Sequence, residues 1–373
     1  MNILYYALPC FLGYGESFKY SISHLKTLFT YSSLKNINPV IIKEKNLSEK
    51  HLDNINNTLP KIKSLDFSLS NNNLLMNFIN NNNISIYHCF HNGFSLCRDF
   101  NTKKISTIYT TLPLNISSSL DDLYWKIYLD RIINTLNISD YIIVPYRFMK
   151  KDLCDFFSIS GENIYVIPPA ITFDLIGKSK LLSKTYVKTK FNINCDYYIY
   201  IGEINTRNTL IDTLKLFKHY SENRDVKLVL SLKYLNKNSS IYYELISFID
   251  RINLTSKVIF INSLCYNDLI NLINASLCFI NLNTFNELNV TTLYALFLNT
   301  KILTYQTYSN LEFLENYPIY ISDYSDAYNI DFHSDNYEEN NIDKEEFYSI
   351  LDKFNIDCIF NSIFDIYKTV LKI

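Results

Sequence analysis

Residues 197–232 read YYIYIGEINTRNTLIDTLKLFKHYSENRDVKLVLSL, and this stretch decides the fold class. Residues 197–201 are an apolar run that predicts a strand, and the strand ends at Gly202. Residues 210–220 repeat apolar side chains at helical spacing, and residues 227–232 predict a second strand. A strand, a helix and a strand in this order predict two parallel strands joined by a crossover helix, which is the repeating unit of an α/β sheet.

The same alternation continues toward the C-terminus. Further strands are predicted at residues 258–261, 278–281 and 301–305, with helices at 241–252, 266–275 and 291–297. Residues 323–346 are acidic and are expected to be solvated. The chain closes with a predicted amphipathic helix over residues 356–371.

The N-terminal half shows a second α/β set. Strands are predicted at residues 2–8, 39–43, 84–89, 106–109, 141–144 and 164–167, with helices at 17–30, 120–136 and 147–157. The asparagine-rich residues 71–83 are expected to form a helix with a solvated end. Pro168 and Pro169 cannot continue a central strand, so they mark a boundary, and the polar, lysine-rich residues 172–190 have the character of a linker.

The chain is therefore an α/β protein with two Rossmann-like domains. We expect an N-terminal domain over residues 1–170, a linker over 171–184, a C-terminal domain over 185–345, and a last helix within 346–373 that crosses back to the N-terminal domain. Two such domains leave a cleft between the carboxyl ends of their parallel strands, where ligands bind.

Composition excludes several classes of protein. Apolar residues make up 48% of the 373 residues and charged residues 19%, which supports large cores and argues against disorder. A net charge of −2 does not suggest a nucleic-acid partner. The N-terminus lacks the basic region of a signal peptide and no apolar run is long enough to span a membrane, so we expect a cytoplasmic protein with at most peripheral contact at the inner face of the membrane.

The eight cysteines are scattered, without a CxxC pair. This spacing indicates buried free thiols in a reducing compartment rather than a disulfide framework. His88 and His91 flank Cys89, but no second ligand cluster accompanies them, so no metal is expected.

Several motifs resemble those of the family 4 glycosyltransferases, which are retaining enzymes with the GT-B fold. In the second half, residues 198–209 (YIYIGEINTRNT) resemble the family stretch YIGxIxPRKN, and residues 258–269 resemble VIFxGxVxxxDL. Residues 275–281 resemble ADLFVFPS, and residues 302–312 run without a gap against VITSNxSSLPE. The motifs occur in the family's order and spacing.

The first half carries weaker matches to the same family. Gly13-Tyr14-Gly15 resembles the glycine loop after the first strand, and His91-Asn92-Gly93 stands where a related branch has xNG. Residues 140–153 resemble ADxIITVSxxxxxDL, and residues 164–169 resemble IxVIPxG. The resemblance therefore covers nearly the whole chain.

The resemblance implies transfer of a sugar, with retention, from a nucleotide-diphosphate sugar to a glycan or other glycoconjugate acceptor, without a metal cofactor. Such enzymes of bacterial surface-polysaccharide synthesis stabilise a leaving diphosphate with cations and hold the sugar with polar groups. The family uses a lysine and an arginine, two glutamates eight positions apart, and a histidine of the first domain.

Most of these family residues are replaced here. The lysine position is Asn208, the glutamate positions are Asn286 and Tyr294, and the histidine position is Tyr109. Glu287 lies next to Asn286, and a one-residue shift would restore one glutamate but places Ala295 at the second position. The glycines around the first glutamate correspond to Glu287 and Asn289.

A few donor contacts remain to be expected. Arg207 is the nearby cation, either a phosphate contact or a solvated loop residue. Gly13 and Gly15 either place backbone N–H groups near the phosphate or form a tight turn. The helix that begins near Thr291 and Thr292 offers N–H groups and two hydroxyls to a phosphate.

Tyrosines stand at several of the positions that bind donor in the family. Tyr14, Tyr109 and Tyr294 are expected either to line the cleft and stack on sugar or base, or to fill the space that the lost residues leave.

Two functions follow from this pattern. The protein is either an active glycosyltransferase with a changed set of donor contacts, or a catalytically degraded member that binds a glycan or a partner glycosyltransferase as a scaffold. Fold alone does not decide between them.

Overall fold

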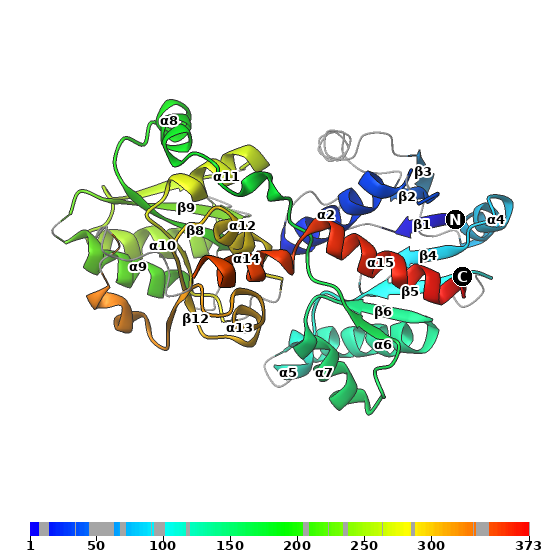
Figure 1. Cartoon of the computed structure of the whole chain (residues 1–373). Coiled ribbons are helices and arrows are strands. Elements are labelled where there is room, and N and C mark those ends of the chain that lie inside the picture. The colour runs from blue at the N-terminus through cyan, green and yellow to red at the C-terminus, as the bar shows by residue number, and fades with distance from the viewer. Residues whose placement is uncertain are drawn as a thin grey trace. The chain divides into compact units, whose positions relative to one another are not determined.

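The computed structural model describes residues 1–6, 15–33, 35–44, 63–67, 72–90, 92, 101–116, 120–203, 209–222, 224–233, 238–262, 264–284, 288–330, 332 and 343–372. The chain divides into two compact units. The first unit comprises residues 1–171 and 352–373, and the second comprises residues 172–351. Each is described separately below, with the element labels of Figure 1.

A parallel sheet forms the centre of the first unit. Among the described residues it has seven strands in the order β3-β2-β1-β4-β5-β6-β7, and every neighbouring pair is parallel. The strands are β1 Asn2–Tyr6, β2 Asn38–Glu44, β3 Lys63–Phe67, β4 Ile86–Cys89, β5 Lys103–Thr107, β6 Tyr141–Val144 and β7 Ile164–Val166. Strands β1, β4, β5 and β6 are almost wholly buried, as expected for a sheet covered on both faces.

The helices of the first unit are α2 Gly15–Tyr31, α4 Asn72–Asn81, α5 Leu112–Asn115, α6 Asp122–Ile138, α7 Arg147–Phe157 and the C-terminal α15 Ile356–Leu371. Helix α15 packs beside α2 in this unit (Figure 1). Its inner face bears Ile359, Ile363 and Tyr367, all buried. The Tyr367 hydroxyl and Nδ1 of His88 on β4 form a hydrogen bond of 2.8 Å. The last helix is therefore joined to the sheet by a polar contact as well as by packing.

The second unit is built in the same way. Its described strands form a six-stranded parallel sheet in the order β10-β9-β8-β11-β12-β13. They are β8 Tyr197–Glu203, β9 Lys227–Lys233, β10 Val258–Ile261, β11 Cys278–Asn281, β12 Ile302–Tyr305 and β13 Ile319–Ile321. These two doubly wound parallel sheets confirm the predicted α/β class with two Rossmann-like domains.

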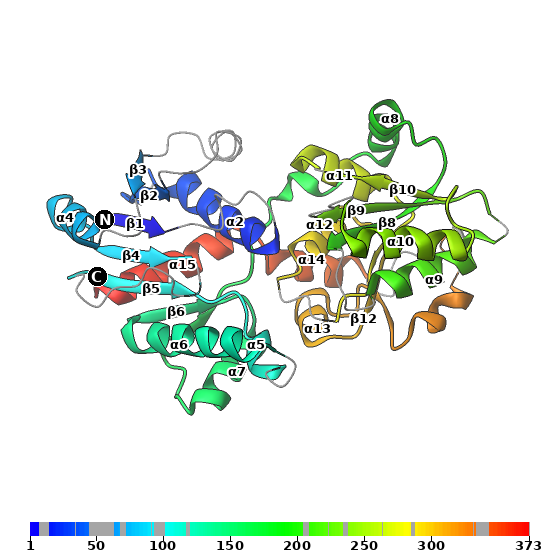
Figure 2. The ribbon, with the colours of Figure 1, turned by 180° about the vertical axis from the view of Figure 1, so that it is seen from behind.

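The helices of the second unit are α8 Lys180–Phe191, α9 Thr209–Ser221, α10 Ser240–Arg251, α11 Tyr266–Ala275, α12 Val290–Phe297, α13 Tyr308–Leu314 and α14 Lys344–Asp352, with short 3₁₀ turns η2 Phe173–Leu175 and η3 Tyr324–Asn329. Helices α9 and α10 lie in front of the sheet in Figure 2. Leu214 and Phe217 of α9 lie in a hydrophobic core that also contains Tyr198 of β8 and Leu228 of β9.

The structure departs from the sequence-based expectation in the lysine-rich segment. Residues 172–190, predicted as a linker, contain η2 and most of α8. Ser179 caps α8 by accepting the N–H of Leu182, and only Ser183 and Val187 of the helix are buried. A helix with so small a buried face has a polar composition, which is why it looks like a linker. The acidic segment 323–346, which was expected to be solvated, holds η3 and the start of α14.

Candidate functional site

The sheet of the second unit defines where a ligand is expected. Strands β9 and β10 extend from one side of β8, and β11, β12 and β13 extend from the other. The direction of winding therefore reverses between β8 and β11. In open parallel sheets ligands bind outside the carboxyl ends of the strands at such a point. Asn281 ends β11 there, and helix α12 follows it in the chain.

A network of buried amides and hydroxyls joins the carboxyl ends of β11 and β12 to the helices that follow them. We call it the asparagine network, and its members are Asn281, Asn289, Thr292, Thr304, Ser309 and Asn310, each less than 7% exposed. None of these six side chains carries a charge.

Asn281 connects the network to the first turn of α12. Its Nδ2 donates to Oγ1 of Thr292 at 2.8 Å, and its carbonyl oxygen accepts the hydroxyl of Thr304 at 2.7 Å. All three residues are buried, so breaking either contact leaves a polar atom without water. The start of α12 is thereby held at the end of β11.

Asn289 connects α12 to α13. It is the N-cap of α12 with φ 45°, a left-handed conformation that asparagine tolerates, and its side chain does not cap the helix. Instead its Nδ2 donates to Oδ1 of Asn310 at 2.7 Å and to Oγ of Ser309 at 3.2 Å. The network therefore continues from the first helix to the second through one amide.

The first turn of α12 can hold an anion. The first backbone N–H groups of any α-helix have no carbonyl partner within the helix, and the helix dipole places partial positive charge there. Thr291 and Thr292 of the predicted site lie in this turn, and both are buried. The Thr292 oxygen accepts from Asn281, which leaves its O–H as a donor, so this hydroxyl and the backbone N–H groups of the turn are the donors that suit a phosphate.

Tyr294, at the second glutamate position of the family, is packed inside the second unit. It is 7% exposed, and its ring meets the ring of Tyr266 edge-on with centroids 5.6 Å apart. Burial raises the pKa of Tyr266 above its usual value, and the nearby Asp174 adds to the effect. Tyr266 is therefore a neutral phenol at pH 7, and the buried Tyr294 ring fills space within the second unit.

Tyr109, at the histidine position of the family, is packed inside the first unit. It follows β5, is 4% exposed, and its hydroxyl lies 2.5 Å from Oγ of Ser21 on α2. Its backbone N–H donates to Oδ1 of Asn92 at 2.7 Å. The ring of Tyr20 meets it edge-on. Tyr109 and Tyr294 are therefore both buried side chains.

Two histidines are buried close to Tyr109 in the first unit. Nε2 of His24 lies 2.9 Å from the carbonyl oxygen of Pro168, and burial lowers the pKa of His24 to about 4 even though this contact acts in the opposite direction. His88 uses both ring nitrogens, on Tyr367 and on Thr107, and burial with the nearby His24 lowers its pKa well below the usual value. Both rings are neutral at pH 7.

Several predicted site residues lie outside the described residues: Gly13, Tyr14, Arg207, Asn208, Asn286 and Glu287. Gly15 opens α2. The structure therefore brings together Thr291, Thr292 and Tyr294 on α12, and holds Tyr109 in the first unit. The asparagine network itself was not predicted. Its one signal in the sequence is Asn289, which stands where the resemblance places a glycine.

The described part of the chain contains no group of three or more histidine, cysteine, aspartate or glutamate side chains arranged for a metal ion. Among the same residues, none of the helices combines the length and the apolar character needed to cross a membrane. Cys89 and Cys278 are buried thiols, whereas Cys265 and Cys358 are exposed.

Comparison with known proteins shows what the chain is similar to. The model of Glycosyltransferase Family 4 matches residues 45–175, which lie mainly in the first unit. No curated protein sequence matches the chain.

Solved structures resemble the chain along its full length. HepE of Anabaena, in complex with UDP and glucose, has a TM-score of 0.76 and 11% identity and covers 99% of this chain and 100% of its own. The sucrose-phosphate synthase of Thermosynechococcus elongatus has a TM-score of 0.74, 12% identity, and covers 100% of this chain and 99% of its own. A glycosyltransferase of Rickettsia africae has a TM-score of 0.71, 13% identity, and covers 100% and 98%.

These matches confirm the predicted GT-B fold and the resemblance to the family 4 glycosyltransferases. At 11–13% identity the solved structures establish the fold, not the reaction.

Proposed function

We propose that this chain, which has the GT-B fold and matches the family 4 glycosyltransferases over residues 45–175, binds a nucleotide-diphosphate sugar in its second unit and transfers the sugar, with retention, to a glycan, lipid or protein acceptor. The observation that carries the proposal is the first turn of α12, held by the asparagine network at the point where the winding of the sheet reverses. HepE, with the same fold, holds UDP and glucose.

The proposed roles follow from the chemistry of the leaving group. Negative charge develops on the nucleoside diphosphate as the glycosidic bond breaks, and backbone N–H groups at a helix N-terminus stabilise such charge. Arg207 is proposed as the accompanying cation, since it follows β8 in the chain. Amide and hydroxyl groups of the network suit the neutral sugar.

The affinity for the nucleotide is expected to be weak. The family that this chain resembles has a lysine at the position of Asn208 and glutamates at the positions of Asn286 and Tyr294. Loss of one well-placed charged group at such a site costs roughly 3 kcal/mol. We therefore expect a dissociation constant no better than about 1 mM, which is roughly −4 kcal/mol.

A second candidate function is supported by the packing of the tyrosines. Tyr109 and Tyr294 are 4% and 7% exposed, and each fills a position at which the resemblance places a residue in contact with the sugar nucleotide. A chain whose donor contacts have been replaced by core residues suits a scaffold that binds a glycan or a partner glycosyltransferase.

Calorimetric titration with UDP, GDP and their sugar conjugates separates the two candidates. The informative variant is Arg207→Ala, and the matched control is Arg224→Ala, because Arg224 is an exposed arginine of the same unit. Binding that Arg207→Ala weakens at least tenfold, while Arg224→Ala leaves it unchanged, supports the transferase proposal. No binding of any nucleotide at 10 mM contradicts it and favours the scaffold, whose partner would then be sought by pull-down.

A further inference from the structure

Asn289 carries a buried oxygen that accepts no hydrogen bond from the residues that the structure describes. The side chain is fully buried, with 0% exposure, and the atom concerned is Oδ1. Nearly all buried amide oxygens of folded proteins are paired, because an unpaired one forfeits the hydrogen bond it makes with water. Oδ1 of Asn289 therefore lacks a donor among the described residues, and a donor group on a bound molecule would satisfy it.

The identity of this atom as an oxygen follows from the network. The carbonyl oxygen of Tyr305 can only accept, so the Asn310 atom that lies 2.8 Å from it is Nδ2. The other Asn310 atom is then Oδ1, which requires a donor from Asn289 at 2.7 Å. Nδ2 of Asn289 therefore faces Asn310, and Oδ1 is the atom that remains. An amide flip would place two donors, or two acceptors, against each other.

Neither backbone conformation nor helix capping accounts for this oxygen. Asn289 has φ 45°, where glycine is at least as favourable, and the resemblance places a glycine at this position. Its side chain makes no capping hydrogen bond to α12. The Nδ2 atom fastens α12 to α13, but that contact leaves Oδ1 unused.

The chemistry of the atom selects the part of the ligand that it would touch. An amide oxygen accepts hydrogen bonds and is repelled by the oxygens of a diphosphate, whereas the adjacent backbone N–H groups of α12 attract them. A sugar hydroxyl can donate. The N-cap of α12 thus offers donors for the phosphate and one acceptor for the sugar beside it.

We propose that Oδ1 of Asn289 accepts a hydrogen bond from one hydroxyl of the donor sugar, which makes Asn289 a specificity-determining residue of the proposed transferase. The inference rests on the proposed function, because it needs a nucleotide sugar at α12. It assigns the sugar contact to an uncharged amide three residues beyond the position where the family has its first glutamate.

The test compares nucleotide sugars with their bare nucleotides. Calorimetry with UDP, UDP-glucose, UDP-galactose, UDP-N-acetylglucosamine, GDP and GDP-mannose gives the factor by which each sugar tightens binding. Asn289→Gly removes the amide and is compatible with φ 45°. The matched control is Asn253→Gly, because Asn253 also has a positive φ, of 60°, but is exposed after α10.

The expected result is selective. For the sugar that binds best, Asn289→Gly weakens the nucleotide sugar about fivefold, the effect of one neutral hydrogen bond, and changes the bare nucleotide less than twofold. Asn253→Gly changes neither. Removing the hydroxyl from the ligand completes the test: one monodeoxy analogue binds wild-type protein about fivefold more weakly, and Asn289→Gly weakens the binding of that analogue no further.

Four results would overturn the inference. If the nucleotides bind but no sugar tightens binding, or if Asn289→Gly weakens UDP and UDP-sugar equally, the side chain has only a structural role and the proposed function stands. If every monodeoxy analogue remains sensitive to Asn289→Gly, no hydroxyl is paired with it. If wild-type protein binds no nucleotide, the proposed function and this inference fail together.

Discussion

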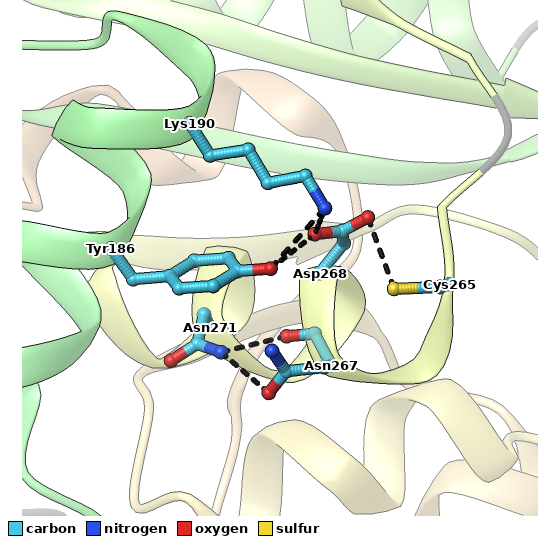
Figure 3. Close-up of polar contacts among 6 residues, drawn as sticks. All are labelled: Tyr186, Lys190, Cys265, Asn267, Asp268 and Asn271. Carbon is cyan, nitrogen blue, oxygen red and sulfur yellow. Dashed lines mark hydrogen bonds and ion pairs between the residues drawn. The ribbon is translucent and has the colours of Figure 1, made fainter.

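Lys190 on α8 and Asp268 on α11 form an ion pair, with Nζ and Oδ1 2.6 Å apart (Figure 3). The carboxylate side chain is 8% exposed and also accepts from the Tyr186 hydroxyl at 2.7 Å and from the Cys265 thiol at 3.1 Å. Burial alone would raise the pKa of the Asp268 carboxyl, but the hydrogen bonds from Lys190, Tyr186 and Cys265 hold it below its usual value. This carboxylate joins α8 to α11 within the second unit.

Asp268→Asn should destabilise the protein by about 2 kcal/mol, because the amide keeps the shape but loses charge-assisted hydrogen bonds at a buried position. The measurement is the free energy of unfolding in urea at pH 7. Asp196→Asn is the matched control, since Asp196 pairs with Lys184 of the same helix but both side chains are more than 40% exposed. Its effect should stay within about 0.5 kcal/mol. Equal effects of the two variants would show that the buried cluster contributes nothing beyond a surface pair.

Buried histidines should make the protein acid-sensitive. The folded-state pKa of His24 is lowered to about 4 by burial, while in the unfolded chain it is about 6.5. The unfolded state therefore binds a proton that the folded state does not, so stability is complete above pH 6.5 and is lost as pH falls toward 4. Between pH 6.5 and 5.0 the loss from His24 amounts to about 2 kcal/mol, at 1.36 kcal/mol per pH unit.

The check is urea unfolding of wild type and His24→Gln at pH 6.5 and 5.0. Glutamine can still donate toward the Pro168 carbonyl but does not titrate, so the variant should lose about 2 kcal/mol less than wild type over this interval. His219→Gln is the control, because His219 is exposed on α9. An unchanged pH dependence in His24→Gln would mean that His24 is solvated or charged in the folded protein.

The contact between Asn281 and Thr292 should be worth more than an ordinary hydroxyl contact. Thr292→Val keeps the side-chain shape but leaves Nδ2 of the buried Asn281 without its acceptor, so we expect a loss of about 2 kcal/mol in the free energy of unfolding. Thr213→Val is the control, because the equally buried Thr213 only donates to the Thr209 carbonyl of its own helix. It should cost less than about 1 kcal/mol. A larger loss of unfolding free energy in Thr213→Val than in Thr292→Val would show that the asparagine network does not stabilise the site.

The reach of sequence-based prediction differs between fold and site. Strands β6, β10 and β11 and helices α7 and α11 begin and end where periodicity places them, because each is an apolar or amphipathic run bounded by polar residues. Strands β3 and β13 and helix α8 were missed. Strand β13 has three residues at a sheet edge, and α8 buries two side chains, so neither produces a periodic signal.

The asparagine network could not be predicted because its contacts are set by the tertiary fold. Asn289 and Asn310 are 21 positions apart, and only the pairing of β11 with β12 brings their helices together. In a chain rich in asparagine, single asparagines carry little information. Tyr109 and Tyr294 illustrate the same limit, because a tyrosine that lines a site and one that fills a core are alike in sequence.

Restoring the family residues should separate a weakened donor site from a filled one. The variant Asn208→Lys, Asn286→Glu, Tyr294→Glu should bind UDP at least tenfold more tightly than wild type if the donor site is accessible, since one recovered cation–phosphate contact is worth a factor of this order. Calorimetry provides the constants, and Asn208→Gln is the uncharged control. Unchanged UDP binding in a folded triple variant would support the scaffold.

The central claim is that a nucleotide sugar binds at the first turn of α12, and hydrogen–deuterium exchange tests it in the unaltered protein. Exchange is followed by mass spectrometry with and without the tightest-binding nucleotide sugar, at a concentration about ten times its dissociation constant. The account predicts slower exchange in peptides that contain residues 288–294, because ligand oxygens would accept from the N–H groups there. Unchanged exchange in those peptides, while calorimetry shows the ligand bound, would contradict it.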